Sequence, residues 1–200
     1  FAITAAVTER SLLSVAELRA AVGASDGSAD AALLALGRQA STAIASKCCI
    51  RDDGTNPPTL LRETVVETFR WSACGPLELS RRPVASITSV TLDGATVDAS
   101  VYELAGRYLH YLISGDPSDW PAGRIVVTYV AGYATAPDSL KLAATKLVTA
   151  LNAEVARDPS LKRESIPGVR DVEHWVAPSD DPLLTKEIDD LIAPYVERWI

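Results

Sequence analysis

The sequence predicts an α+β fold: a helical bundle with an inserted small antiparallel β module, either a barrel or a sandwich, and a C-terminal arm plus helix. Three observations support this prediction. Apolar residues recur at helical spacing before residue 48 and again after residue 137. Between these parts the period falls to two, and runs rich in Val, Thr and aromatic residues alternate with turn residues. From residue 181 the helical spacing returns.

The order of these patterns divides the chain into four segments. They are an N-terminal helical pair (1–56), an inserted β module (57–133), a long bundle helix (134–158) and a C-terminal arm with a docking helix (159–200). Because helical segments flank the β module in the sequence, we expect the helices to pack together.

The first helix is expected over residues 15–22. Ser14 and Glu17 have the Ser-x-x-Glu spacing of a capping box, Leu13 and Leu18 have the spacing of a hydrophobic staple, and Gly23 provides the stop.

The second helix, over residues 31–49, is rich in Ala, Gly and Ser, which allows neighbouring helices to approach closely. Its expected buried stripe is Leu33, Leu36, Ala40, Ile44 and Lys47, and the candidates for its N-cap are Asp26, Ser28 and Asp30.

About six short strands are expected between residues 60 and 131. The first, over 60–71, places Leu61, Glu63, Val65, Glu67, Phe69 and Trp71 on one side, so its pattern leaves open which face points inward. The others are expected at 77–79, 84–92, 107–113 and 124–130 and in the alternating run that follows Gly94. Asp93-Gly94 predicts a tight turn after the strand at 84–92.

A structural seam joins the last of these strands to the next helix. We assign it to Tyr129, Gly132, Tyr133 and Pro137. Gly132 permits backbone conformations that a side chain disfavours, and proline suits the first turn of a helix.

The remaining elements are a long helix, an arm and a final helix. The long helix has the stripe Leu140, Ala144, Leu147, Leu151 and Val155 and ends at Asp158-Pro159. Residues 160–180 have no clear period and predict an extended or irregular arm. The last helix is expected to begin at Asp181-Pro182, and Pro194 is expected to kink it or end it early.

Composition argues against several classes of function. The net charge of −7 disfavours tight binding to a nucleic-acid backbone, which depends on Lys and Arg. Cys48, Cys49 and Cys74 are odd in number, so they predict buried structural cysteines in a reducing compartment rather than a disulfide framework. We find neither a signal-peptide pattern nor an apolar run long enough to span a membrane, and therefore expect a soluble protein without a membrane partner.

The motif search predicts no catalytic residue, no metal site and no cofactor. His110 and His174 lack a nucleophile elbow and are not at zinc-ligand spacing from the cysteines, and no glycine pattern forms a phosphate loop. Arg81-Arg82 is interpreted as an exposed strand end or an intersubunit salt bridge. One enzymatic or ligand-binding alternative stays open: a β-barrel pocket lined by Tyr108, His110, Tyr111 and Trp120.

Three segments carry a resemblance to a known family. Residues 77–104 contain Leu-x-Leu-x-Arg-x-Pro-Val, then Ile-x-Ser-Val and, after the turn, Tyr-x-Leu. Residues 120–148 contain Trp-Pro, then Val-x-Tyr-x-Ala-Gly-Tyr and a helix that follows a proline. Together with the opening helix pair, these segments resemble the head–tail connector, or adaptor, proteins of long-tailed phages. Relatives of those proteins occur in prophages and in the gene transfer agents of alphaproteobacteria. The resemblance covers about residues 14–157.

The resemblance implies a structural role and no catalysis. Such adaptors form a ring, usually dodecameric, beneath the portal protein of a virion or phage-like particle, after assembly in the host cytoplasm. The ring extends the channel through which double-stranded DNA passes without sequence-specific binding, and it joins the head to a stopper or tail protein. Another neck component, a stopper or a tail-completion protein, is the nearest alternative.

Two groups of residues are the candidate interfaces. The portal or partner interface consists of Leu191, Ile192, Tyr195, Val196, Trp199 and Ile200. The arm or neighbour interface consists of Ile166, Val169, His174 and Trp175. Terminal aromatic residues serve docking and core packing equally well, so burial of the last helix in its own helical core remains the alternative.

Overall fold

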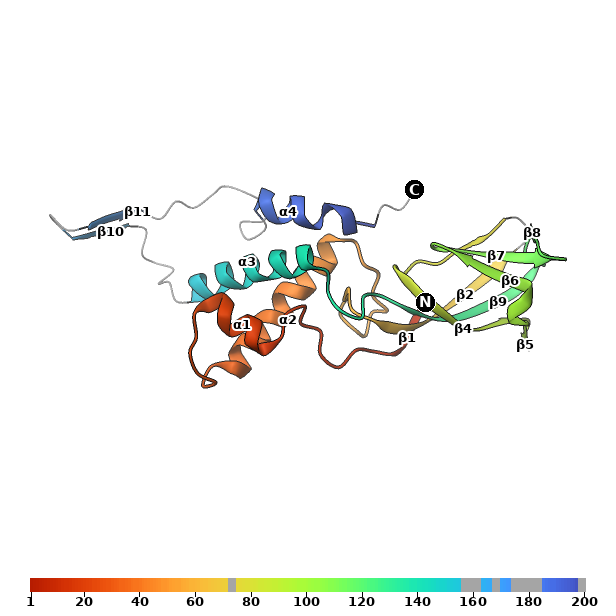
Figure 1. The fold of residues 1–200 in the computed structure, drawn as a ribbon, viewed down its shortest axis with the longest axis horizontal. Coiled ribbons are helices and arrows are strands. Elements are labelled where there is room, and N and C mark those ends of the chain that lie inside the picture. Colours follow the sequence, from red (N-terminus) through yellow and green to blue (C-terminus); the bar gives the residue numbers. More distant parts are fainter. Residues whose placement is uncertain (72–74, 156–162, 167–169, 174–184, 198–200) are drawn as a thin grey trace. The chain divides into compact units, whose positions relative to one another are not determined.

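The computed structural model describes residues 1–71, 75–155, 163–166, 170–173 and 185–197 (Figure 1). The chain forms two compact units. A β unit consists of residues 1–10 and 49–136, and a helical unit consists of residues 11–48 and 137–200. The expected α+β class is confirmed, with the β unit inserted between helices in the sequence. The β unit also takes in residues 1–10 and 49–56, which the sequence division placed with the helical pair, and residues 134–136, which it placed with the long helix.

The β unit is a sandwich of two antiparallel sheets. The larger sheet has the order β1-β2-β9-β4-β5, and the smaller has the order β3-β7-β6, with β8 also paired to β7. The strands of the larger sheet are β1 (Ala2–Ala5), β2 (Glu63–Trp71), β4 (Val84–Leu92), β5 (Ala95–Thr96) and β9 (Gly123–Ala131). Those of the smaller sheet are β3 (Leu77–Glu78), β6 (Tyr102–Ala105), β7 (Tyr108–Ile113) and β8 (Asp116–Ser118); the 3-10 turn η1 (Ala99–Val101) precedes β6.

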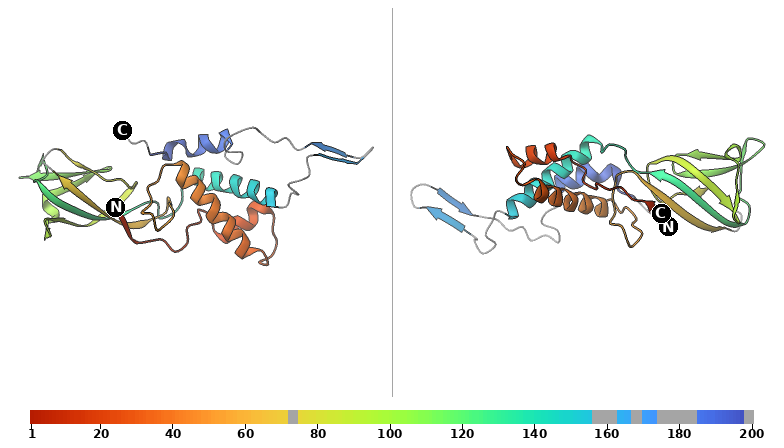
Figure 2. Two further views of the ribbon diagram at one scale, coloured as in Figure 1. Left: turned by 180° about the vertical axis from the view of Figure 1, so that it is seen from behind. Right: turned by 90° about the horizontal axis from the view of Figure 1, so that it is seen from below.

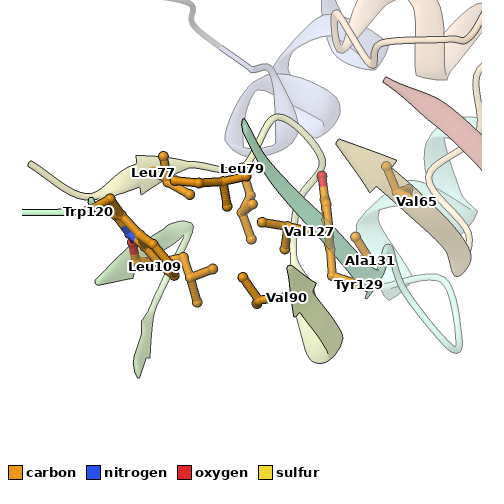
Figure 3. Packing of buried hydrophobic residues seen from close by; sticks show 10 residues of the cluster. Val65, Leu77, Leu79, Val90, Leu109, Trp120, Val127, Tyr129 and Ala131 are labelled. Carbon is orange, nitrogen blue, oxygen red and sulfur yellow. The ribbon is translucent and has the colours of Figure 1, made fainter. Parts of the chain in front are cut away.

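The core of the sandwich lies between the two sheets, as Figure 3 shows. Its buried members are Val65, Leu77, Leu79, Val90, Leu109, Trp120, Ile125, Val127, Tyr129 and Ala131. The side of β2 that points inward is therefore the one with the two glutamates: Glu63, Val65 and Glu67 are all buried. The hydropathy pattern left this face undecided because carboxylates alternate there with apolar residues.

Strand β1 was not expected from the sequence. Ala2–Ala5 pairs antiparallel with β2, and Asp53 helps to hold it, because its carboxylate accepts a hydrogen bond from the Ile3 backbone N–H at 3.1 Å. Only four residues long and mostly small, this strand gives little periodic signal.

The helical unit contains α1 (Val15–Val22), α2 (Asp30–Lys47), α3 (Asp138–Val155), α4 (Lys186–Ile192) and the 3-10 turn η2 (Ala193–Tyr195). The turned views in Figure 2 show α1, α2 and α3 packed together. The capping box is confirmed: Ser14 Oγ accepts from the Glu17 N–H, and the Glu17 carboxylate accepts from the Ser14 N–H at 2.7 Å. At α2 the N-cap is Ala29, which makes no side-chain cap, so the three proposed capping residues were wrong.

Close helix packing at the small residues of α2 is confirmed at Gly37. A Cβ at this position would lie 2.7 Å from Ser11 Oγ and about 3 Å from both methyl groups of Leu18. Only glycine lets α1 and the segment before it approach α2 so closely.

The final helix begins later than predicted and ends at the predicted proline. Its N-cap is Thr185, and Asp181-Pro182 lies outside the described residues. The helix changes to the 3-10 turn η2 at Ala193-Pro194, as expected for a proline inside a helical run. Within the arm, for which an extended or irregular course was expected, β10 (Arg163–Ile166) and β11 (Arg170–Glu173) are extended strands that pair antiparallel.

Candidate functional site

The proposed β-barrel pocket is not formed. Because side chains alternate along β7, Tyr111 lies on one side of the strand and Tyr108 and His110 lie on the other. Tyr111 packs inward against Trp120, with ring centroids 5.1 Å apart, whereas Tyr108 and His110 lie on the outer face. Trp120 is completely buried, and its indole N–H donates to the Leu109 carbonyl at 2.8 Å. The four residues therefore do not converge on one cavity.

The part of the chain that the structure describes offers no group of three or more His, Cys, Asp or Glu residues arranged to hold a metal ion. None of its helices is long and apolar enough to cross a membrane. Cys48 is buried as expected, but Cys49 is exposed, and Cys74 lies outside the described residues.

Arg81 forms the centre of a buried ionic cluster, which corrects its interpretation as an exposed residue. Its side chain is fully buried, and its guanidinium lies 3.1 Å from the Glu63 carboxylate. It also donates to the carbonyls of Thr59 and, at 2.9 Å, Arg51. Arg10 reaches the other Glu63 oxygen at 3.3 Å. The cluster thus joins the N-terminal segment, the loop before β2 and the segment before β4.

A buried ion pair of this kind is sensitive to the loss of one partner. Removing one charge leaves the other without compensation in a low-dielectric interior, whereas replacing both by apolar groups is often neutral. Arg81 follows Leu77 and Leu79 in the Leu-x-Leu-x-Arg-x-Pro-Val motif, and all three side chains are buried.

A second buried carboxylate belongs to Glu67. It accepts hydrogen bonds from the Ser80 backbone N–H at 3.2 Å and from the Tyr129 hydroxyl. The Tyr129 oxygen also accepts from the Arg81 backbone N–H at 3.2 Å. Burial raises the pKa of Glu67, and these hydrogen bonds oppose that rise. Tyr129, predicted as a seam residue, therefore lies in the core and positions the segment between β3 and β4.

The seam at Gly132 is a close approach of two backbone segments. Gly132 has φ +99°, and a Cβ there would lie 2.3 Å from the Leu61 carbonyl oxygen. Its N–H donates to Pro83 O at 2.8 Å, and the Tyr133 N–H donates to Leu60 O at 2.9 Å. The end of β9 is thus fixed to the start of β2 and the start of β4, and Pro137 immediately precedes α3.

The residues of the candidate portal interface differ in their exposure in the structure. Ile192 is 1% exposed and is buried within the helical unit, where α4 packs on α3. Tyr195 is half-buried and shares a 2.6 Å hydrogen bond with Ser139. Leu191 and Val196 are partly exposed, and Trp199 and Ile200 lie outside the described residues. In the arm, Ile166 is in β10, and Val169, His174 and Trp175 lie outside the described residues.

The chain matches a model of a known protein family. The model for head completion proteins matches residues 11–153. The chain belongs to the head completion protein family. The matched residues include α1, α2, the sandwich from β2 onward and nearly all of α3, so both units of this head completion protein carry the family pattern. The resemblance to head–tail adaptors is thereby confirmed at the level of the family.

Solved structures with the same fold come from gene transfer agent (GTA) particles. One is a chain in the neck of an empty GTA particle computed with C6 symmetry, with 21% identity and a TM-score of 0.61; the match covers 100% of this chain and 97% of the other. Another, from the virion of a native GTA particle, has 21% identity, a TM-score of 0.60 and coverage of 99% and 95%. A third, from the neck of a native particle computed with C12 symmetry, has 20% identity, a TM-score of 0.58 and coverage of 100% and 97%. A search of curated protein sequences gave no match.

Sequence reasoning missed two features of this head completion protein that organise the β unit. One is the Glu63–Arg81 cluster, whose partners are 18 residues apart. The other is the hydrogen bond by which Asp53 holds the N-terminal segment. The Asp53 carboxylate also accepts hydrogen bonds from the Thr55 and Asn56 N–H groups. These hydrogen bonds lower the pKa of Asp53. Neither could be found by periodicity, because each depends on contacts between distant segments.

Proposed function

We propose that this protein is a structural head–tail adaptor of a tailed phage or phage-like particle. Copies of the chain form a ring under the portal protein, extend the DNA channel and provide the platform for a stopper or tail protein. The family match over residues 11–153 is the observation that carries the proposal. The fold shared over nearly the full length of chains from GTA particles, two of them described as neck structures, supports a place in the particle neck.

The C-terminal end is proposed to contact the portal, with fewer residues than the sequence suggested. Ile188 and Ile192 hold α4 on its own unit, so they are assigned to stability rather than to docking. The residues proposed to contact the portal are Leu191, Tyr195, Val196, Trp199 and Ile200. The arm residues Ile166, Val169, His174 and Trp175 are proposed to contact a neighbouring copy.

Loss of the protein from the particle tests the proposed role. A strain that lacks the gene is expected to accumulate heads without attached tails, and a plasmid copy is expected to restore complete particles. Electron microscopy of purified particles provides the measurement. Normal numbers of tailed particles in the deletion strain would refute the role.

Deletion of residues 198–200 tests the docking assignment separately. The truncated chain keeps α4 and η2 and is expected to unfold within about 2 °C of the intact protein, but to be incorporated into particles at least tenfold less. Ile192→Ala is the matched control: it removes buried atoms and should destabilise the helical unit by about 2–5 kcal/mol. Full incorporation of the truncated chain would remove these residues from the portal interface.

A further inference from the structure

The outer face of the larger sheet has an unusual composition for an acidic protein. On β2 and β9, three successive cross-strand pairs each join a threonine to a valine: Thr64 with Val130, Val66 with Thr128, and Thr68 with Val126. The intervening residues point into the core, including both glutamates of β2. Among the described residues of β2 and β9, the outer face therefore carries no carboxylate.

Three arginines stand at the two ends of this face. Arg70 and Arg124 are direct cross-strand partners. Arg62 immediately precedes β2 and, by the alternation of the strand, belongs to the same face as Arg70. The two are about 27 Å apart along the strand at 3.3–3.4 Å per residue. All three are exposed, and within the described structure none of the three guanidiniums has a hydrogen-bond or ion-pair partner. The nearby Asp93 carboxylate accepts the backbone N–H of Arg124 at 2.8 Å.

Like charges directly opposite each other on a sheet are destabilising. Three other arginines of the β unit are matched by carboxylates: Arg10 and Arg81 by Glu63, and Arg107 by Glu78 at 2.9 Å. The Arg70–Arg124 pair thus lacks the compensation that an acidic partner surface would provide.

The outer face of the smaller sheet has the complementary character. Glu103 lies opposite His110, and Glu78 lies opposite Tyr108, all four pointing away from the core residues of β6 and β7. Tyr108 is 37% exposed, which is unusual for so large a ring. This face combines the Tyr108 ring, which the Arg107 guanidinium covers on one side at 5.2 Å from the ring centroid, with two carboxylates. Arg107 pairs with Glu78, whereas Glu103 has no arginine partner in the described structure.

We propose that the face with Arg62, Arg70 and Arg124 on one copy docks against the face with Glu103 and Tyr108 on the β unit of the next copy. The proposal rests on the ring assembly proposed above and names the surfaces that form it. Because the two faces lie on opposite sides of one sandwich, the contact is heterologous and repeats from copy to copy, and such a contact closes into a ring when the rotation between successive copies divides a full turn evenly. Valine methyl groups would meet the Tyr108 ring, and Arg70 and Arg124 would meet Glu103.

Charge and composition favour a second copy over DNA as the occupant. The β unit contains eight arginines, no lysine and eleven acidic residues, so its overall charge opposes a polyanion. The centre of the arginine face consists of valine and threonine, which suits a protein surface with an apolar middle and an acidic edge.

Carbodiimide cross-linking tests this contact directly, because it joins an amine to a carboxylate at contact distance. Since the β unit has no lysine, Arg124→Lys introduces a single side-chain amine there. Equal amounts of ¹⁴N- and ¹⁵N-labelled full-length variant are mixed at up to about 1 mM, and mixed-isotope peptides identify links between copies. We expect links from position 124 to Glu103 or Glu78 between copies, and a link to Asp93 within a copy as the internal control. Arg51→Lys, away from this face, should give neither of the links between copies.

Charge reversal provides a second measurement on the same surfaces. Arg70→Glu with Arg124→Glu, or Glu103→Arg alone, is expected to reduce association at least tenfold by sedimentation velocity, and mixing the two proteins should restore it. A protein that remains monomeric at 1 mM, or links from position 124 that reach only other carboxylates, would overturn the proposal. So would duplex DNA binding that requires Arg70 and Arg124 when no links form between copies. A ring in the particle neck with cross-links elsewhere would refute this interface and leave the adaptor role intact.

Discussion

Substitution of Gly132 by alanine tests whether the seam between β9, β2 and β4 depends on a close backbone approach. A Cβ at this position would lie 2.3 Å from Leu61 O and 2.7 Å from Leu61 C, which are backbone atoms and cannot rotate away. The φ of +99° adds strain for any residue with a side chain. Either the turn or the Leu61 segment must therefore move.

The size of the stability loss follows from the backbone strain and from the hydrogen bonds that this movement breaks. A residue with a side chain in this conformation costs about 1–3 kcal/mol. The seam has three backbone hydrogen bonds, from Gly132 N to Pro83 O, from Tyr133 N to Leu60 O and from Arg62 N to Tyr133 O, at 2.8–3.0 Å. Loss of two of them adds roughly 0.5–1.5 kcal/mol each. The expected loss of stability is about 2–6 kcal/mol, a large part of what a domain of this size has.

Gly94→Ala is the matched control. Gly94 also has a positive φ, +86°, but nothing lies within 4 Å of the position that a Cβ would take, so only the conformational penalty applies. Urea unfolding followed by near-ultraviolet circular dichroism reports on the β unit through the buried Trp120 and its neighbour Tyr111. We expect Gly132→Ala to lose at least about 1 kcal/mol more than Gly94→Ala, because both variants carry the conformational penalty and only Gly132→Ala also loses hydrogen bonds. Equal losses in the two variants would show that the close approach at Leu61 contributes nothing.

Three further predictions concern ionisable residues. Arg81→Met should destabilise the β unit by about 3–5 kcal/mol, and adding Glu63→Leu should restore most of that loss, as measured by urea unfolding. Because burial raises the pKa of Glu67, its contribution to stability is largest below its unfolded pKa and falls as pH rises through the folded value. Glu67→Gln should therefore gain stability relative to the wild type as pH rises above about 4.5. The hydrogen bond from Lys141 and those from Ser14 lower the pKa of Glu17 to about 2, so its contribution is present above about pH 4.5 and is lost toward pH 2; Glu17→Gln should flatten the acid limb of the unfolding profile of the helical unit.

The controls for these predictions come from the same chain. Arg19→Met breaks an ion pair with Asp30 that is about one-third exposed, and should cost less than about 1 kcal/mol. Glu154→Gln, at an exposed position of α3, should leave the acid limb unchanged. A double variant at Arg81 and Glu63 no more stable than the single one, or a pH profile unaltered by Glu67→Gln or by Glu17→Gln, would contradict the corresponding assignment.

The order and type of most elements could be predicted because they depend on local patterns. The capping box at Ser14, the turn at Asp93-Gly94 and the strand at 84–92 each follow from neighbouring residues. The family resemblance rested on similar short motifs and on the passage from β9 to α3.

The inward face of β2 and the role of Arg81 could not be predicted, because they depend on contacts across the sequence. Glu63 is tolerated inside only because Arg81 and Arg10 neutralise it, and neither lies near it in the chain. Ile192 likewise looked available for docking until the packing of α4 on α3 showed it to be buried. Terminal apolar residues carry no sequence signal that separates core packing from partner binding.

We propose that this head completion protein is a ring component of the neck, and a reconstruction of the complete particle tests that proposal. The chain, tagged at its exposed β4–β5 turn, would be located by cryo-electron microscopy of purified particles. We expect a ring of copies between the portal and the tail, with density for both the β unit and the helical unit in each copy. Tag density elsewhere in the particle, or its absence from complete particles, would contradict the claim.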